Sequence, residues 1–154
     1  MRRLFIIRKD LHLSAGKLAA MVGHCCEAYW TNILKSCAKK DNSDIMFGTK
    51  QITVDIDADI WNNYVNGMFT KTICECRNRN QLMKAVQFAE DNFLHEGTDY
   101  GLINDRCLTE LTPENPDGTT TVGIWFKPMK DEFVHMISRK FMLYRSKGEN
   151  NDPN

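Results

Sequence analysis

The stretch Leu4-Phe5-Ile6-Ile7-Arg8-Lys9-Asp10-Leu11-His12-Leu13-Ser14-Ala15-Gly16-Lys17 leads from a short apolar run into the start of a helix. The run Leu4 to Arg8 is rich in β-forming residues and is apolar until its last position, which is typical of a strand buried on both faces. Ser14 is a favourable N-cap, and the residues at positions 18, 22, 25, 29 and 33 are apolar with helical spacing. The stretch therefore predicts a central strand followed by an amphipathic helix that ends at about Lys35.

Further strands and helices alternate along the rest of the chain. Polar residues alternate with β-branched and apolar ones in the predicted strands, and apolar residues recur at helical spacing in the predicted helices. The expected strands are Phe69 to Arg77, Tyr100 to Ile103 and Thr119 to Phe126. The expected helices are Asp59 to Gly67, Asn80 to His95 and Lys130 to Arg139. We expect a loop at Lys39 to Asp44 and a short strand or an extended segment at Gln51 to Ile56. This order predicts an α/β fold of three layers, in which helices cover both faces of a mixed β-sheet of about four strands.

The length and composition indicate one globular domain. The chain has 154 residues, of which 42% are hydrophobic and 26% charged, and these values are typical of a folded rather than a disordered protein. No linker rich in Pro, Gly or Ser divides the chain. We expect the domain to span residues 1–147 and residues 148–154 to form a polar C-terminal tail.

The first residues do not resemble an export signal. Only four apolar residues, Leu4 to Ile7, separate Arg3 from Arg8, which is too few for a signal peptide or a membrane span, so we expect a cytoplasmic protein. The cytoplasm is reducing, and no pairing pattern is evident among the six cysteines. We therefore predict free thiols, most of them buried.

The formal net charge is zero, so only a local basic patch could attract a polyanion. Basic residues gather near both ends of the sequence, and much of the acid lies between them. The N-terminal cluster consists of Arg2, Arg3, Arg8, Lys9 and Lys17, and the C-terminal cluster of Arg139, Lys140, Arg145 and Lys147. We predict that the two clusters form a basic surface, and the alternative is an ordinary solvated face.

Lys17 and His24 lie on one side of the first predicted helix. At about 100° per residue, these two positions form a stripe with Met21 and Ala28, roughly a quarter turn from the core stripe. Gly16 allows another chain to come close to the first turn, where the helix dipole favours an anion and a lysine adds a full charge. We infer an anion site here, whereas spacing alone favours an exposed surface lysine.

Asp105 comes shortly after the predicted strand Tyr100 to Ile103. Binding sites in open α/β sheets form outside the carboxyl ends of strands. A carboxylate there can orient or deprotonate water, and Thr109, four residues later, can hold the water or a carbonyl group. The alternative is an aspartate that caps a turn.

Three segments follow a family pattern in the right order. The first segment comes after an apolar strand and reads Gly16-Lys17-Leu18-Ala19-Ala20-Met21-Val22-Gly23-His24. The second, Tyr100 to Leu111, is a strand followed by Asp, three residues and Thr. The third precedes Pro128 and reads Thr120-Thr121-Val122-Gly123-Ile124. Together these segments resemble the type 2 peptidyl-tRNA hydrolases over nearly the whole chain. The resemblance implies hydrolysis of the ester bond of peptidyl-tRNA, or of an N-blocked aminoacyl-tRNA, without a cofactor.

The resemblance also implies roles for individual residues. The family's catalytic residues correspond to Lys17, His24, Asp105, Thr109 and Thr120. Water attacks the ester carbonyl, Asp105 with Thr109 orients or activates that water, and Lys17 stabilises the negative charge or clamps the terminal phosphate. The expected substrate-binding residues are Arg8, Lys9, Gly16 and Lys127. We expect tRNA as the partner and neither DNA nor a membrane, and homodimerisation is left open.

Two departures from the family pattern favour an alternative function. Met21 stands where the family has glutamine, and Trp125-Phe126-Lys127-Pro128 stands where it has a Gly-Pro-Gly-Pro loop. The alternative is a non-catalytic module on the same fold that binds tRNA or a protein. A zinc site is disfavoured, because His24 and the cysteines lack both a Cys-x-x-Cys pair and the His-x-Glu signature of deaminases.

Overall fold

The computed structural model describes residues 1–40 and 48–145. Most of the expected loop Lys39 to Asp44, the residue Lys147 and the expected tail 148–154 lie outside the described residues. In chain order the elements are β1 Arg3–Arg8, α1 Ala15–Lys40, α2 Ala58–Ile60, the π-helical turn η1 Trp61–Val65, β2 Lys71–Cys76, α3 Arg79–Asp91, β3 Tyr100–Asp105, β4 Thr120–Phe126, α4 Asp131–Ser138 and β5 Met142–Leu143. The predicted helices and strands are present, but the helix expected to end at His95 ends at Asp91, and most of the one expected over Asp59 to Gly67 is π-helical. Residues 51–56 belong to neither a helix nor a strand.

Five strands form one mixed sheet in the order β3-β4-β1-β2-β5. β1 pairs with β2 in parallel, whereas β4 is antiparallel to both β1 and β3, and β5 is antiparallel to β2. The α/β class and the mixed sheet are confirmed, with one strand more than expected. That strand, β5, has only two residues and so shows no alternation that a sequence pattern could detect.

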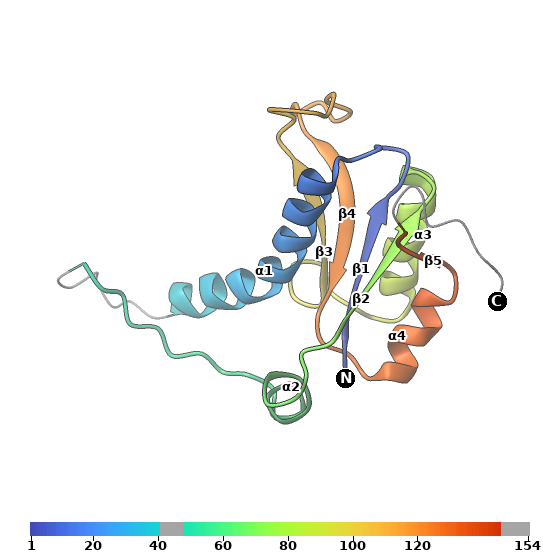
Figure 1. The fold of residues 1–154 in the computed structure, drawn as a ribbon. Coiled ribbons are helices and arrows are strands. Elements are labelled where there is room, and N and C mark those ends of the chain that lie inside the picture. The colour runs from blue at the N-terminus through green and yellow to red at the C-terminus, as the bar shows by residue number, and fades with distance from the viewer. Residues whose placement is uncertain (41–47, 146–154) are drawn as a thin grey trace.

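The sheet separates two hydrophobic cores, with α3 and α4 on one side and α1 and α2 on the other (Figure 1). Leu4 and Ile6 of β1 pack with α3 and α4. Phe5 and Ile7 pack with α1 and the α2–η1 segment, because neighbouring residues of a strand face opposite sides. All six residues of β1 are buried. This strand is therefore the centre of a three-layer fold, as the sequence predicts.

Helix α1 begins at the predicted residue and continues beyond the predicted end. Ser14 Oγ accepts a hydrogen bond from the Lys17 amide at 3.2 Å, and Ser14 O accepts one from the Leu18 amide at 2.8 Å. These are the bonds of an N-cap, and they confirm the start of the helix. The helix then runs to Lys40.

Most of the residues that depart from the family pattern lie in the core. Met21 is 2% exposed and packs between α1 and the sheet, so the expected stripe beside the core is wrong at this position. Trp125 and Phe126 are the last residues of β4, where both are buried, and do not form a loop. Gly101 of β3 makes room for Trp125, since a Cβ at Gly101 would lie 2.8 Å from the indole nitrogen.

Two arginines of the N-terminal basic cluster are buried. The guanidinium of Arg3 donates hydrogen bonds to the carbonyl oxygens of Cys25 and Cys26 at 2.8 Å each and to that of Phe126 at 3.1 Å. Burial lowers the pKa of Arg3. Arg8 is also only 3% exposed. The predicted N-terminal basic surface is therefore wrong for these two residues.

The carboxyl ends of β1, β2 and β3 lie at one edge of the sheet, which is the upper edge in Figure 1. β1 and β3 run in the same direction but are not neighbours, because β4 lies between them and runs in the opposite direction. Their carboxyl ends therefore lie at the same edge. Helix α1 begins at this edge, and residues 106–119 return the chain there to the start of β4.

The buried cysteines should react more slowly with alkylating reagents than the more exposed ones. Burial raises the pKa of Cys25 and of Cys76 to about 12 and that of Cys74 to about 11, which keeps these thiols protonated. Cys37 and Cys107 are only half-buried, and so is Cys26, which packs against the core beneath α1, so the prediction that most of the thiols are buried is wrong. Iodoacetamide should therefore label Cys37 and Cys107 of the native protein first at about pH 8, as followed by peptide mass spectrometry. Equal labelling rates at Cys25 and Cys37 would contradict this description of the core.

Candidate active site

Lys17 contacts both Asp105 and Thr109 at the carboxyl edge of the sheet, and we call these three residues the edge cluster. Lys17 Nζ lies 2.7 Å from Asp105 Oδ2 and 3.4 Å from Thr109 Oγ1. The side chains of the lysine and the aspartate are 14% and 9% exposed, so their ion pair is largely shielded from water. The fold thus joins the start of α1 to the end of β3 and to the loop that follows it.

Glu110 stabilises the turn at the start of α1 that carries Lys17. Its carboxylate accepts hydrogen bonds from Ser14 Oγ and, at 3.1 Å, from the Ser14 amide. These bonds hold the pKa of Glu110 below its ordinary value. Glu110 could not be identified from the sequence, because its partner is apparent only once residues 106–119 fold over the start of α1. The one local signal is the acidic residue directly after Thr109.

Asp105 is the last residue of β3 and faces the α1 side of the sheet. Ile103 packs on the same side, as alternate residues of a strand do. A register shift directly after Ile103 precedes the pairing of Asp105 with Thr120 of β4, and such irregularities are common beside active sites. The Cys107 amide donates a hydrogen bond to Asp105 Oδ1 at 2.8 Å. Both carboxylate oxygens therefore have a donor, since Lys17 lies against the other one.

The surroundings of Asp105 keep its carboxyl group ionised. Burial acts to raise the pKa, but the hydrogen bonds from Lys17 and from the Cys107 amide, together with the positive charge of Lys17, outweigh burial. A positive charge on His24 acts in the same direction, and the pKa lies below its ordinary value. An ionised carboxylate can orient a water molecule, and it becomes more basic if the lysine moves away.

A hollow of about 620 Å³ opens beside Asp105, between α1 and the end of β3. Its lining includes His24 and Lys35 of α1, and Arg106 and Leu108 from the loop after β3. His24 is exposed and lies about two helical turns after Lys17. The hollow therefore offers space for a ligand next to the Asp105 carboxylate, and its lining holds cationic and apolar side chains as well as a second carboxylate, that of Glu27.

Thr120 and Arg8 hold the loop between β3 and β4. The Thr120 hydroxyl donates to Thr112 O at 2.7 Å and accepts from the Glu114 amide at 3.0 Å. Arg8 donates to the two carboxylate oxygens of Glu114 at 2.5 and 2.9 Å and pairs with Asp10 at 2.7 Å. Because carboxylates of the chain surround its guanidinium, Arg8 is bound within the protein.

The other expected substrate-binding residues differ in their position. Gly16 lies in the exposed first turn of α1, and a Cβ there would meet no atom within 4 Å. Lys9 pairs with Glu75 at 2.7 Å at the end of β1. Lys127 follows β4 at the opposite edge of the sheet and pairs with Asp99 at 2.7 Å. The structure brings Gly16 next to the edge cluster and does not bring Lys127 there.

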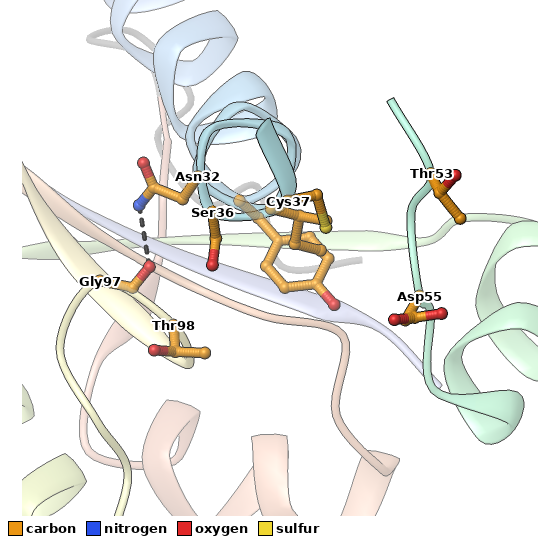
Figure 2. Close-up of a pocket in the computed structure, with 9 residues that line it drawn as sticks. Asn32, Ser36, Cys37, Thr53, Asp55, Gly97 and Thr98 are labelled. Atoms are coloured by element: carbon orange, nitrogen blue, oxygen red, sulfur yellow. Dashed lines mark hydrogen bonds between the residues drawn. The ribbon is translucent and has the colours of Figure 1, made fainter. Parts of the chain in front are cut away.

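A separate hollow of about 590 Å³ lies along the second half of α1 (Figure 2). Side chains from α1, from residues 53–55 and from residues 97–98 surround it, and Asn32 donates a hydrogen bond to Gly97 O at 2.9 Å. It shares Asn32 with the hollow beside Asp105, but none of the three residues of the edge cluster lines it. This hollow is therefore not part of the edge cluster.

No three His, Cys, Asp or Glu side chains of residues 1–40 and 48–145 are grouped so that they could hold a metal ion. None of the helices described there is long and apolar enough to cross a membrane.

The open α/β sheet presents a paired lysine and aspartate beside a hollow, at the carboxyl ends of its strands, where ligands bind in such sheets. The family model described as peptidyl-tRNA hydrolase PTH2 matches residues 1–144. The chain therefore belongs to the PTH2 peptidyl-tRNA hydrolase family, a family of hydrolases, and the resemblance noted in the sequence is confirmed. No curated protein matches the chain.

Removing the charge of Lys17 should raise the pKa of Asp105. In Lys17→Met the burial of the carboxyl group remains, while the hydrogen bond and the charge that oppose it are lost. The chemical shift of the Asp105 carboxyl carbon, followed by NMR as a function of pH, measures the change. Lys130→Met, at an exposed position before α4, is the control and should leave the titration unchanged.

The same shift predicts how this pair contributes to stability. The pKa of Asp105 is depressed in the folded protein, so the pair stabilises the fold above the ordinary carboxyl pKa, and this contribution is lost as the pH falls through the folded value. An identical Asp105 titration in wild type and Lys17→Met would contradict the ion pair.

Proposed function

We propose that the protein hydrolyses the ester bond of peptidyl-tRNA, or of an N-blocked aminoacyl-tRNA, and releases peptide and free tRNA. The observation that carries the proposal is the contact of Lys17 with Asp105 and Thr109 beside an open hollow. Membership of a peptidyl-tRNA hydrolase family supports the choice of substrate. Because this substrate is a product of translation, we place the activity in the cytoplasm.

In the proposed reaction, water adds to the carbonyl carbon of the ester. Asp105 and Thr109 orient the water, and Asp105 takes a proton from it. Lys17 donates a hydrogen bond to the carbonyl oxygen as negative charge develops there. As Lys17 turns towards that oxygen, Asp105 loses the hydrogen bond that depresses its pKa. The carboxylate therefore becomes more basic at the step in which it must accept the proton.

The tetrahedral intermediate then collapses, and the bond between the carbonyl carbon and the ribose oxygen breaks. The proton held by Asp105 passes to that oxygen, and the tRNA leaves with a free hydroxyl group. The oxygen of the water remains in the new carboxyl group of the peptide, and Asp105 returns to its ionised form. The sequence of steps requires neither a covalent enzyme intermediate nor a cofactor.

Three further residues have supporting roles in the proposal. His24 lines the hollow beside Asp105 and is placed to contact the bound substrate. Thr120 holds the loop opposite Asp105, and Gly16 leaves the first turn of α1 open to a phosphate. Three other cations pair with carboxylates outside the edge cluster and are assigned to the fold instead: Arg8, Lys9 and Lys127.

A non-catalytic binding module on the same fold is the alternative. Its support in the sequence is the presence of Met21 and of the segment Trp125 to Pro128. Met21, Trp125 and Phe126 are core residues and do not belong to the edge cluster. These substitutions therefore leave the lysine, the aspartate and the threonine in contact, which favours hydrolysis over the alternative.

Asp105→Asn and Lys17→Ala should each lower kcat/KM for peptidyl-tRNA by about a hundredfold or more. Asparagine keeps the shape of the side chain but cannot accept the proton, and alanine removes the ammonium group. Thr109→Val should cost less, because solvent can replace a hydroxyl that only positions water. The measurement is the release of peptide from purified peptidyl-tRNA.

Asp99→Asn is the matched control for these variants. Asp99 is also largely buried and pairs with a lysine at 2.7 Å, but it lies at the opposite edge of the sheet. This variant should keep the wild-type rate, and melting temperatures show whether each variant is folded. Wild-type rates in both Lys17→Ala and Asp105→Asn would contradict the proposal.

A further inference from the structure

A second hollow lies at the same edge of the sheet, on the face covered by α3, and it is strongly basic. It has a volume of about 540 Å³, and we call it the α3 groove. Its lining consists of three exposed cations, Arg77, Lys84 and Lys140, three amides, Asn78, Asn80 and Gln81, and the ring of Phe141. No carboxylate lines it. In a chain of zero net charge, this concentration of cations forms a local positive field that attracts anions.

The carboxylates next to the α3 groove are already neutralised. Asp10 and Glu75 line the adjoining hollow, which shares Arg77, Gln81 and Lys140 with the groove. Asp10 pairs with Arg8, and Glu75 pairs with Lys9, each at 2.7 Å. The acidic residues nearby therefore do not cancel the charge of the groove.

The three cations of the groove are available to a ligand. Arg77 and Lys84 form no ion pair with any carboxylate among residues 1–40 and 48–145. Lys140 lies over the ring of Phe88, with its Nζ 4.6 Å from the ring centre, and it too has no carboxylate partner in those ranges. This arrangement differs from that of Arg8 and Lys9, whose charges are bound within the protein.

The amides at the start of α3 add hydrogen-bond donors. Asn78 Oδ1 accepts a hydrogen bond from the backbone N–H of Gln81 at 3.0 Å, and Gln81 Oε1 accepts one from the backbone N–H of Arg77 at 2.7 Å. The oxygen of each side chain is thus engaged, and no described residue accepts a hydrogen bond from either NH₂ group. Phosphate oxygens accept hydrogen bonds from both cations and amides. The groove therefore matches the chemistry of a phosphate group.

We propose that the α3 groove binds backbone phosphates of the tRNA whose ester bond the edge cluster cleaves, and this inference rests on the proposed function. The position of the groove favours RNA, because β2 and β3 are three strand spacings apart, roughly 14 Å at about 4.8 Å each. A polynucleotide whose ester lies at Asp105 can extend to the end of β2 along this edge. The half-buried ring of Phe141 supplies a surface on which a base can stack.

The double variant Arg77→Glu/Lys84→Glu tests the proposal. The slope of log K against log salt for deacylated tRNA, measured between about 50 and 200 mM, should fall by about two, one for each lost phosphate contact. KM for peptidyl-tRNA should rise with kcat unchanged, since the groove lies away from the reacting atoms. Hydrolysis of an N-blocked aminoacyl-adenosine, which is too short to reach the groove, should keep the wild-type rate.

Lys71→Glu/Lys130→Glu is the matched control. It makes the same change in net charge at two exposed lysines at the opposite edge of the sheet, and it should leave the salt slope and KM unchanged. A salt slope and a KM in the Arg77→Glu/Lys84→Glu variant equal to those of the wild type would overturn the proposal, even if the wild type hydrolyses peptidyl-tRNA.

Two further outcomes separate the groove from the proposed function and from another partner. If the wild type hydrolyses no peptidyl-tRNA, the proposed function fails, while the salt slope for deacylated tRNA still decides whether the groove binds RNA. Polyglutamate of matched charge should bind far more weakly than tRNA. If it binds as tightly, and if Arg77→Glu/Lys84→Glu abolishes that binding, the groove takes an acidic protein segment and the proposal is wrong.

Discussion

The burial of all six residues of β1 is the constraint on which the rest of the structure depends. A strand that is covered on both faces requires helices on each face of the sheet and a paired strand along each of its two sides. Here these paired strands are β2 and β4. The strand also buries Arg3, whose guanidinium binds two carbonyl oxygens of α1 and so joins this helix to the sheet. The direction of β1 then determines at which edge the start of α1 and the end of β3 meet.

The helices, the strands and the α/β class could be predicted from the sequence, because hydrophobic spacing and capping residues such as Ser14 act between near neighbours in the chain. The order of the strands could not be predicted in the same way. Residues Thr120 to Phe126 form a strand in either direction, and only the packed sheet places them antiparallel between β1 and β3. β5 escaped detection because two residues carry no periodic signal.

The edge cluster could be predicted as a group, since Lys17 begins a helix and Asp105 ends a strand at one edge of the sheet. The partners of other charged residues could not be predicted, because they depend on the tertiary fold. Arg8 belongs to a basic cluster in the sequence, yet in the structure it is buried and paired with Asp10 and Glu114. For the same reason no basic run in the sequence indicates the exposed cations of the α3 groove. Arg77 follows β2, Lys84 lies in α3 and Lys140 follows α4.

A double-mutant cycle between Lys17 and Asp105 tests the central claim most directly, namely that the two side chains act as one unit through their 2.7 Å contact. The values to compare are kcat/KM for wild type, Lys17→Ala, Asp105→Asn and the double variant. Residues that act as a unit are not additive, so the double variant should be about as slow as the slower single variant, near a hundredfold below wild type. A loss of about ten thousandfold, the product of two independent effects of about a hundredfold each, would contradict the account.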